Sequence, residues 1–373
     1  MRGTVHLVYP HGARISCPDA IGRKLGHDLE RDYEVKYYDV DEPRTISPGA
    51  GDVLIGHPHP YPWTVFRRSM KRKGWARVIA MSPYHHGDRA QVAFLDGCIP
   101  FCDAYLAITG NYWFRRIDES PFVHWRPRMV HLDLAVDRQD FPILKRRFNP
   151  QGQRKLVYIG SKAAPKNTRY LERIVARMPR VDCAWMGTGR GRIAGCRKLG
   201  YRDFADPAAQ QLVSEYDFLI TVGHADANPT TILEAMAWGL IPVCTPQSGY
   251  EEYPGIVNVP LDSPEVAVDR IEMLQEATES QLRAMQEANW NALDTHFNWP
   301  RFGGEVREAI SGRSRPELGA ERLCRRAALV LWAWTASSSP IHPRSVIRSV
   351  RRDADARIRT ERTSDRPMVE PRG

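Results

Sequence analysis

The chain has 373 residues, of which 42% are hydrophobic, and a formal net charge of +9. That length suits two α/β domains of about 150 residues each, and no run of about 18 apolar residues predicts a membrane-spanning helix. The chain begins in a strand-like run without the apolar core of a signal peptide, and its seven scattered cysteines predict free thiols. We therefore expect a cytoplasmic protein.

The positive charge is concentrated at the end of the chain. Residues 311–373 contain 14 Arg, no Lys and 7 acidic residues, a net charge of +7, which leaves about +2 for the first 310 residues. The overall charge is therefore a poor argument for nucleic-acid binding, and we expect no nucleic-acid partner. Ser, Pro and Arg dominate this tail, which predicts that most of it is disordered.

The first 150 residues alternate short apolar runs with helical stretches. A helix is predicted over 19–31, and strands are predicted over 5–9, 35–40, 53–55, 78–81 and 104–108. Short strands separated by helices are typical of βαβ units and a parallel sheet. A break rich in Arg, Pro and Asn follows, and we place a linker within it, near 149–153.

The same alternation restarts after the linker. Strands are predicted over 155–159, 181–186, 217–222 and 241–244, and helices over 168–176, 207–215, 230–238, 264–278 and 279–297. The fold class is therefore α/β, with two Rossmann-like domains. The predicted domains are 1–150 and 151–310, followed by the Arg-rich tail 311–373.

One βαβ unit of the second half has a ligand-binding pattern. Strand 217–222 leads into a loop, and Asn228 and Pro229 suit the N-cap and first position of helix 230–238, with Gly239 at its end. The start of this helix would lie at the carboxyl edge of the sheet, where open α/β sheets bind ligands.

The residues at this helix start suit a nucleotide sugar. Exposed amides of Thr230 and Thr231 favour a phosphate, and the Glu234 carboxylate can accept two hydrogen bonds from a ribose diol. Asp226, in the preceding loop, can reach a sugar hydroxyl. An ordinary helix glutamate and an ordinary turn aspartate are the alternative for each residue alone, but the combined spacing favours a site.

The run from Asp226 to Gly239, Asp-x7-Glu continued by Ala-Met-Ala-x-Gly, resembles the donor motif of retaining GT-B glycosyltransferases of the group 1 or family 4 type. Three further stretches agree with that family in order and spacing: Tyr158–Ser161 with Lys166, Trp185–Gly189, and Leu134–Asp137 with Phe141. The resemblance covers residues 1–310, is strongest over 130–260 and leaves out the tail.

This resemblance implies the GT-B fold, in which two Rossmann-like domains face a central cleft. It implies a hexosyltransferase that moves a sugar from a nucleotide-diphosphate sugar to an acceptor with retention of anomeric configuration. The donor would bind the C-terminal domain, and a glycan, lipid-linked or small-molecule acceptor would bind the N-terminal domain. Because cationic side chains and helix dipoles neutralise the diphosphate, no metal or other cofactor is expected, and polysaccharide biosynthesis is the expected setting.

The resemblance also assigns donor-binding residues. Lys166 matches the family's phosphate lysine, while Ser161 stands where the family has an arginine, with Lys162 as a replacement charge. Gly12 either lets the backbone approach the phosphates or belongs to a plain turn. Asp226 replaces the usual glutamate and is the predicted catalytic carboxylate.

A histidine of the N-terminal domain often lies near the sugar in this family. His85 and His86 follow the strand predicted over 78–81, and His85 is the first choice for a catalytic role. His57 and His59, after another strand, are rivals, and each of the four can instead be structural.

Other patterns point elsewhere. Asp39-Val40-Asp41 resembles the metal-binding Asp-x-Asp of the other glycosyltransferase fold, and Gly187–Gly191 resembles a dinucleotide loop without its spacing. A nucleotide-sugar epimerase, a phosphorylase-like enzyme or a non-catalytic nucleotide-sugar-binding subunit are alternatives to the transferase.

The segment Trp63–Trp75 predicts a basic amphipathic helix. Trp63, Phe66 and Met70 share one face, and five basic residues cover the rest. This is either a surface helix that packs its apolar stripe on the sheet or a contact with an anionic membrane surface. The second interpretation predicts peripheral association with the inner face of the membrane and a lipid-linked or cell-envelope acceptor.

Overall fold

The structure is a computed structural model that describes residues 3–11 and 17–312. All of these residues fall within one compact unit. The predictions for Gly12 and for the tail beyond residue 312 lie outside the described residues. In the part of the chain that is described, no helix is long and apolar enough to cross a membrane.

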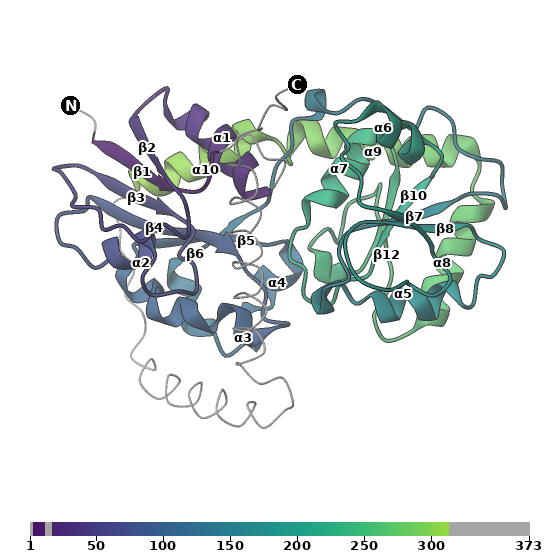
Figure 1. Ribbon diagram of the computed structural model, residues 1–373, viewed down its shortest axis with the longest axis horizontal. Helices are drawn as coiled ribbons and strands as arrows, with labels where there is room; N and C mark the ends of the chain where they lie inside the picture. Colours follow the sequence, from purple (N-terminus) through teal and green to yellow (C-terminus); the bar gives the residue numbers. More distant parts are fainter. Residues whose placement is uncertain (1–2, 12–16, 313–373) are drawn as a thin grey trace, which may run out of the picture. The chain divides into compact units, whose positions relative to one another are not determined.

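The first half of the chain forms a six-stranded parallel sheet in the order β2-β1-β3-β4-β5-β6 (Figure 1). The strands are β1 (Thr4–Val8), β2 (Glu34–Tyr38), β3 (Val53–Gly56), β4 (Arg77–Pro83), β5 (Ala104–Ile108) and β6 (Met129–Leu132). Helices α1 (Cys17–Leu29) and α10 (Trp299–Ser311) lie on one face, with α2 (Val65–Ser69) and α3 (Arg89–Val92) on the other. Helix α4 (Asn111–Arg115) follows β5.

The second half forms another six-stranded parallel sheet, in the order β12-β11-β10-β7-β8-β9. The strands are β7 (Leu156–Ile159), β8 (Cys183–Met186), β9 (Arg197–Gly200), β10 (Phe218–Thr221), β11 (Ile241–Cys244) and β12 (Val257–Asn258). The helices are α5 (Thr168–Val175), α6 (Pro207–Ser214), α7 (Thr230–Trp238), α8 (Pro264–Glu276) and α9 (Glu279–Thr295). Helix α5 packs with α8, and α7 packs with α9 (Figure 1).

Burial explains why these strands form parallel sheets. Every residue of β5, β10 and β11 is buried, as expected for strands covered by helices on both faces. The two longer strands that the sequence failed to predict, β6 and β9, are both sheet edges. Edge strands keep polar or exposed residues, so they lack the continuous apolar run that identified the central strands.

Helix α10 was also not predicted, and its main contacts are with the first half of the chain. It contacts α1 and β4 of the first half, and Arg307 pairs with Asp28 at 2.6 Å and with Asp32 at 3.1 Å. The sequence assigned residues up to 310 to the second domain, so α10 is an exception to that assignment. The remaining boundaries stay predictions.

The strand order reverses once in each sheet. The reversal falls between β1 and β3 in the first sheet and between β7 and β10 in the second. Crevices at the carboxyl ends of strands flanking such a switch point are the usual ligand sites of open α/β sheets. In the second sheet, the loops that leave this point are the ones that hold Lys166 and Asp226.

Candidate functional site

Helix α7 begins at the carboxyl edge of the second sheet and has the predicted bounds. It ends at Gly239, whose φ of 90° is the left-handed conformation that glycine adopts readily. The prediction that Asn228 caps this helix is wrong, because the N-cap is Pro229. The Asn228 side chain instead accepts a hydrogen bond from the Leu134 amide at 2.6 Å and donates one to Asp133 at 3.0 Å.

An ion pair spans the switch point of the second sheet. Lys166 Nζ, in the loop after β7, lies 2.5 Å from Asp226 Oδ2, in the loop after β10. The amide of His224 also donates to the Pro165 carbonyl at 3.0 Å, which ties the two loops together. Both charged side chains are partly exposed, so a ligand can reach them.

Glu234 lies one turn into α7 and is partly buried. Burial raises the pKa of its carboxyl group to about 7, and no side chain of the described residues donates a hydrogen bond to it. Burial and the charge of Glu234 raise the pKa of the Cys17 thiol to about 12, so the start of α1 lies near this carboxylate. A partly buried carboxylate without a partner is costly for the fold and available to a ligand.

His85 follows β4 and is only 6% exposed. Burial lowers its pKa, while the charges of Asp88 and Asp226 act in the opposite direction, which places His85 near Asp226. A Cβ atom on Gly87 would lie 2.9 Å from the His224 carbonyl oxygen, so the loop after β4 touches the loop after β10. The structure thus brings His85, Asp226 and Lys166 into one region.

His85 Nδ1 accepts a hydrogen bond from the Asp88 amide at 3.3 Å, and the other candidate histidines also make local contacts. Burial lowers the pKa of His57 to about 4, and its Nδ1 accepts a hydrogen bond from the His59 amide at 3.0 Å. Burial also lowers the pKa of His86 to about 4, and this ring packs edge-on against Trp113. His85 is the candidate of these four that senses the charge of Asp226.

Ser161 and Lys162 lie at the carboxyl ends of β7 and β8, beside a small cavity. Lys162 Nζ donates to the Arg192 carbonyl at 2.6 Å, in the loop between β8 and β9. Ser161 lines a cavity of about 210 Å³ together with Thr188 and Tyr201. The sequence did not point to Tyr201, because that residue follows the unpredicted edge strand β9.

Thr230 and Thr231 are the first two residues of α7 and are partly exposed. Their backbone amides belong to the first turn, where a helix has no internal acceptors. They lie between the loop that holds Asp226 and the buried Glu234 carboxylate. The donor-binding candidates therefore divide into one set around Lys166, Asp226 and the start of α7, and a second set beside the small cavity.

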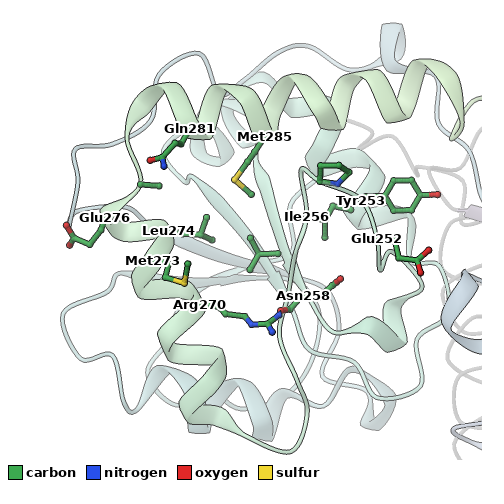
Figure 2. Close-up of a pocket in the computed structure, with 13 residues that line it drawn as sticks. Glu252, Tyr253, Ile256, Asn258, Arg270, Met273, Leu274, Glu276, Gln281 and Met285 are labelled. Atoms are coloured by element: carbon green, nitrogen blue, oxygen red, sulfur yellow. The ribbon is translucent and has the colours of Figure 1, made fainter.

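A larger cavity, of about 860 Å³, lies away from these residues, between α8, α9 and the segment 252–258 (Figure 2). Met273 and Met285 contribute to its lining, and none of the predicted site residues does. This cavity and the predicted site are therefore separate places in the fold.

A buried polar cluster joins the end of β6 to the loop before α7 and to the end of α9. Asp133 accepts hydrogen bonds from Asn228 at 3.0 Å, His131 at 3.2 Å and His296 at 2.8 Å. Burial opposes ionisation of Asp133, but the two histidines outweigh it and lower its pKa. This cluster was not predicted, because its members are far apart along the chain.

Metal ligands were not a feature of the predicted site. In residues 3–11 and 17–312, no group of three or more His, Cys, Asp or Glu side chains is arranged to hold a metal ion. Asp39 and Asp41 are both exposed in the loop after β2.

The two parallel sheets and their connections define the class of fold: the chain has the GT-B fold, as predicted. No protein-family model and no curated protein matches the sequence. Among solved structures, the chain is similar to sucrose-phosphate synthase from Thermosynechococcus elongatus, with a TM-score of 0.60, 11% identity, and coverage of 82% of this chain and 98% of that one.

Two further solved structures show the same likeness. The catalytic domain of starch synthase IV from Arabidopsis thaliana, bound to ADP and acarbose, gives a TM-score of 0.58 at 10% identity over 83% of this chain and 99% of that one. TarM gives 0.54 at 10% identity over 70% of this chain, which spans 55% of the TarM chain. At such low identity these likenesses establish the fold alone.

Proposed function

We propose that the protein is a glycosyltransferase that moves a sugar from a nucleotide-diphosphate sugar to an acceptor, with retention and without a metal ion. The observation that carries this proposal is the Lys166–Asp226 ion pair, which spans the switch point of the second sheet beside the unpaired carboxylate of Glu234. Solved structures of the same fold include complexes with ADP and with UDP, which supports a nucleotide donor.

The donor would occupy the start of α7. The amides of Thr230 and Thr231 and the ammonium of Lys166 would bind the diphosphate, since a helix N-terminus and a lysine both favour an anion. Lys166 would then exchange the carboxylate of Asp226 for a phosphate oxygen, which frees Asp226 to accept a sugar hydroxyl. Glu234 would accept the ribose hydroxyls.

The small cavity beside Ser161 offers a place for the nucleobase. Its volume is about 210 Å³, and it adjoins the carboxyl ends of β7 and β8. The ring of Tyr201 belongs to its lining, and aromatic rings stack on bases. Lys162, held by the Arg192 carbonyl, would act from the rim of this cavity rather than on the sugar.

In a transfer with retention by front-face attack, the bond between the sugar and the diphosphate breaks as the acceptor oxygen attacks the face that the diphosphate leaves. The departing phosphate would take the acceptor proton, and Lys166 with the α7 N-terminus would neutralise the charge on the leaving group. Burial lowers the pKa of His85, so its imidazole is neutral at pH 7 and can hydrogen-bond to the sugar without adding charge.

Nucleotide titration followed by donor hydrolysis tests this proposal. Calorimetry with UDP, GDP and ADP identifies the nucleotide, and release of that nucleotide from its sugar donor measures turnover. Glu234→Ala should abolish nucleotide binding, whereas Asp226→Ala should bind nucleotide and lose mainly turnover. Glu287→Ala, an exposed glutamate of α9, is the matched control and should retain both.

The outcomes separate the alternatives. Full activity in both site variants would show that the assigned residues are wrong. Nucleotide binding without donor turnover in the wild type would identify a non-catalytic binding subunit. Conversion of the free nucleotide sugar into its epimer would identify the epimerase.

The acceptor side involves the surface over α2. The helix predicted over Trp63–Trp75 forms only over Val65–Ser69. The side chains of Phe66 and Met70 are buried, so most of the predicted apolar stripe packs into the fold. Trp63 is 52% exposed and Phe101 is 40% exposed, with Lys71 Nζ 5.2 Å from the Phe101 ring. Exposed aromatics among cations suit the interface of an anionic bilayer.

We propose that this surface holds the protein at a membrane and favours a lipid-linked acceptor. Binding to vesicles that contain anionic lipid should fall as salt increases, because the attraction is screened. The double variant Trp63→Ser, Phe101→Ser has the same charge as the wild type and should bind these vesicles more weakly. Equal binding to neutral and anionic vesicles would remove the anionic lipid from the proposal, and no binding to either would remove the membrane.

A further inference from the structure

Two cysteines of the second sheet lie side by side. Cys183 is the first residue of β8, and Cys196 immediately precedes β9. Their sulfur atoms are 3.2 Å apart, and both cysteines are free thiols in the structure. Ala184 pairs with Arg197 in the parallel ladder between β8 and β9. Cys183 and Cys196 each precede one of these residues, so they are also neighbours across the two strands, with side chains on the other face of the sheet.

This placement fits a disulfide closely. Adjacent strands are about 4.8 Å apart, which is within the range of about 4.4–6.8 Å between the Cα atoms of bonded cysteines. Gly195 has a φ of 78°, and a Cβ atom there would lie 2.6 Å from Val175 Cγ1, so glycine lets the chain pass close to α5 just before Cys196.

The two thiols differ in access and acidity. Cys183 is 2% exposed, whereas Cys196 is partly exposed. A hydrogen bond from Cys183 lowers the pKa of the Cys196 thiol, and the same interaction with burial raises the pKa of Cys183. Cys196 is therefore the thiol that can attack an external disulfide, since the thiolate is the nucleophile.

We propose that Cys183 and Cys196 are a modification site that forms a reversible intramolecular disulfide with a low-molecular-weight disulfide as the oxidant. The Cys196 thiolate attacks one sulfur of the oxidant and releases one small thiolate, which leaves a mixed disulfide on Cys196. Cys183 then gives up its proton and attacks Cys196 Sγ, and the second small thiolate leaves. The oxidant gains two electrons and the two cysteines lose them.

The bond would fasten an edge strand to its sheet. Strand β9 pairs only with β8 within the described sheet, and its residues are partly or fully exposed. The loop between the two strands supplies Gly187 and Thr188 to the small cavity, and Lys198 Nζ donates to the carbonyl of Gly189 in the same loop. Oxidation should therefore slow hydrogen exchange in β9 and slow tryptic cleavage after Arg190 and Arg192.

Other cysteines of the described residues are less well placed to form a disulfide. Cys98 and Cys102 are also near each other, but the Cys102 thiol donates to the Cys98 carbonyl oxygen at 3.3 Å rather than facing its sulfur. Cys244 lies in the interior strand β11, where its thiol is near the Asn258 amide. Cys102→Ser therefore removes a buried cysteine of comparable environment without touching the proposed site.

The test uses the full-length protein in native buffer with oxidised glutathione, followed by alkylation of free thiols and peptide mapping. We expect the wild type to lose two of its seven thiols and to yield a linked pair of peptides that contain Cys183 and Cys196. Cys102→Ser should form the same link. Cys183→Ser should instead carry one glutathione on Cys196, and Cys196→Ser should form neither product.

Reduction of the oxidised wild type should restore all seven thiols and the original rate of hydrogen exchange in β9. Retention of all thiols, a link that forms only in denaturant, or a link between other cysteines would overturn the proposal. None of these measurements depends on glycosyl transfer, so a failure here is distinct from a failure of the proposed activity.

Discussion

The two sheets have the same number of strands and the same parallel pairing, but their switch points hold different chemistry. At the first, the ring of His57 accepts a hydrogen bond from the backbone amide of His59. Burial lowers the pKa of His57 to about 4, which keeps this ring neutral at pH 7. At the second, Lys166 and Asp226 are paired with each other, and the partly buried Glu234 has no partner among the described residues. Among the described residues, the polar groups of the first switch point have partners within the chain, whereas Glu234 at the second has none.

The two switch points therefore differ in what they contribute to stability. Polar groups with internal partners support a fold, whereas a buried acid without a partner weakens it. Such a group is expected at a functional site, because a ligand supplies what the fold lacks. If the second switch point alone has this character, substitutions there should affect activity more than substitutions at the first.

Lys166→Ala should cause the largest loss. The variant removes the cation that would neutralise the leaving diphosphate, so we expect kcat/KM for donor hydrolysis to fall by about 10²–10³-fold. Lys155→Ala is a matched control, because it also removes a lysine that is paired with an aspartate. Lys155 directly precedes β7, and its Nζ lies 3.9 Å from Asp182 Oδ2. Steady-state kinetics with the donor identified by titration measure both. Equal rates for the two variants would remove the second switch point from the chemistry.

Asn228→Ala should have the next largest effect, because it joins the two halves at the start of α7. The Asn228 side chain is fully buried, and its loss leaves the Leu134 amide and one bond of Asp133 unsatisfied. We expect the free energy of unfolding to fall by about 2–4 kcal/mol. Urea denaturation of both purified proteins gives the difference.

The control for this prediction is Asn289→Ala, which removes a buried amide that donates to the Gly255 carbonyl at 2.9 Å. Both variants should be less stable, but only Asn228→Ala should also weaken nucleotide binding and speed hydrogen exchange at the start of α7. If both variants bind nucleotide equally well, the junction with Asp133 stabilises the fold without positioning the site.

Much of the fold was predictable from local pattern. Strands β5 and β11 and helix α7 have the predicted bounds, because each is a buried apolar segment between polar or glycine punctuation. The edge strands β6 and β9 were missed, since partial exposure removes that pattern. Short strands at an edge depend on a neighbour for their structure, and the neighbour is not visible locally.

The candidate site shows the same limit. The motif placed Asp226 in the loop before α7 and Glu234 on the helix itself, and the structure has both where the motif placed them. The bond between Asn228 and Asp133 connects residues 95 positions apart, and the sequence predicted a local helix cap for that asparagine instead. The Asn228 side chain bonds to Leu134 and Asp133 rather than to the amides of α7, because a buried side-chain amide needs partners for both its oxygen and its nitrogen.

Glu234→Gln should stabilise the fold while it weakens donor binding. Burial raises the pKa of this carboxyl to about 7 in the folded protein. Below the unfolded pKa of about 4.5 both states are protonated, so burial costs nothing there. As pH rises from that value through 7, the unfolded state ionises first and the folded state becomes less stable by about 1–2 kcal/mol after allowance for partial exposure.

Glutamine lacks this titration, so the gain in the free energy of unfolding should be absent at pH 4 and complete at pH 8. Thermal or urea denaturation across this range measures it, with Glu287→Gln as an exposed control that should show no gain. Nucleotide affinity of the wild type should rise through pH 7 as the carboxylate forms. A gain that is equal at both pH values would show that Glu234 is not held with a raised pKa.

His59→Asn should have the smallest effect and tests the first switch point. His59 has a φ of 29°, and its Nδ1 accepts from the Tyr61 amide at 3.3 Å, so asparagine tolerates the backbone and can replace the acceptor. Donor hydrolysis should change by less than about twofold, as expected for a substitution outside the reacting groups. A loss beyond tenfold, with stability unchanged, would give the first switch point a direct role in the reaction. The two sheets would then share the chemistry, because the groups that act on the sugar would come from both.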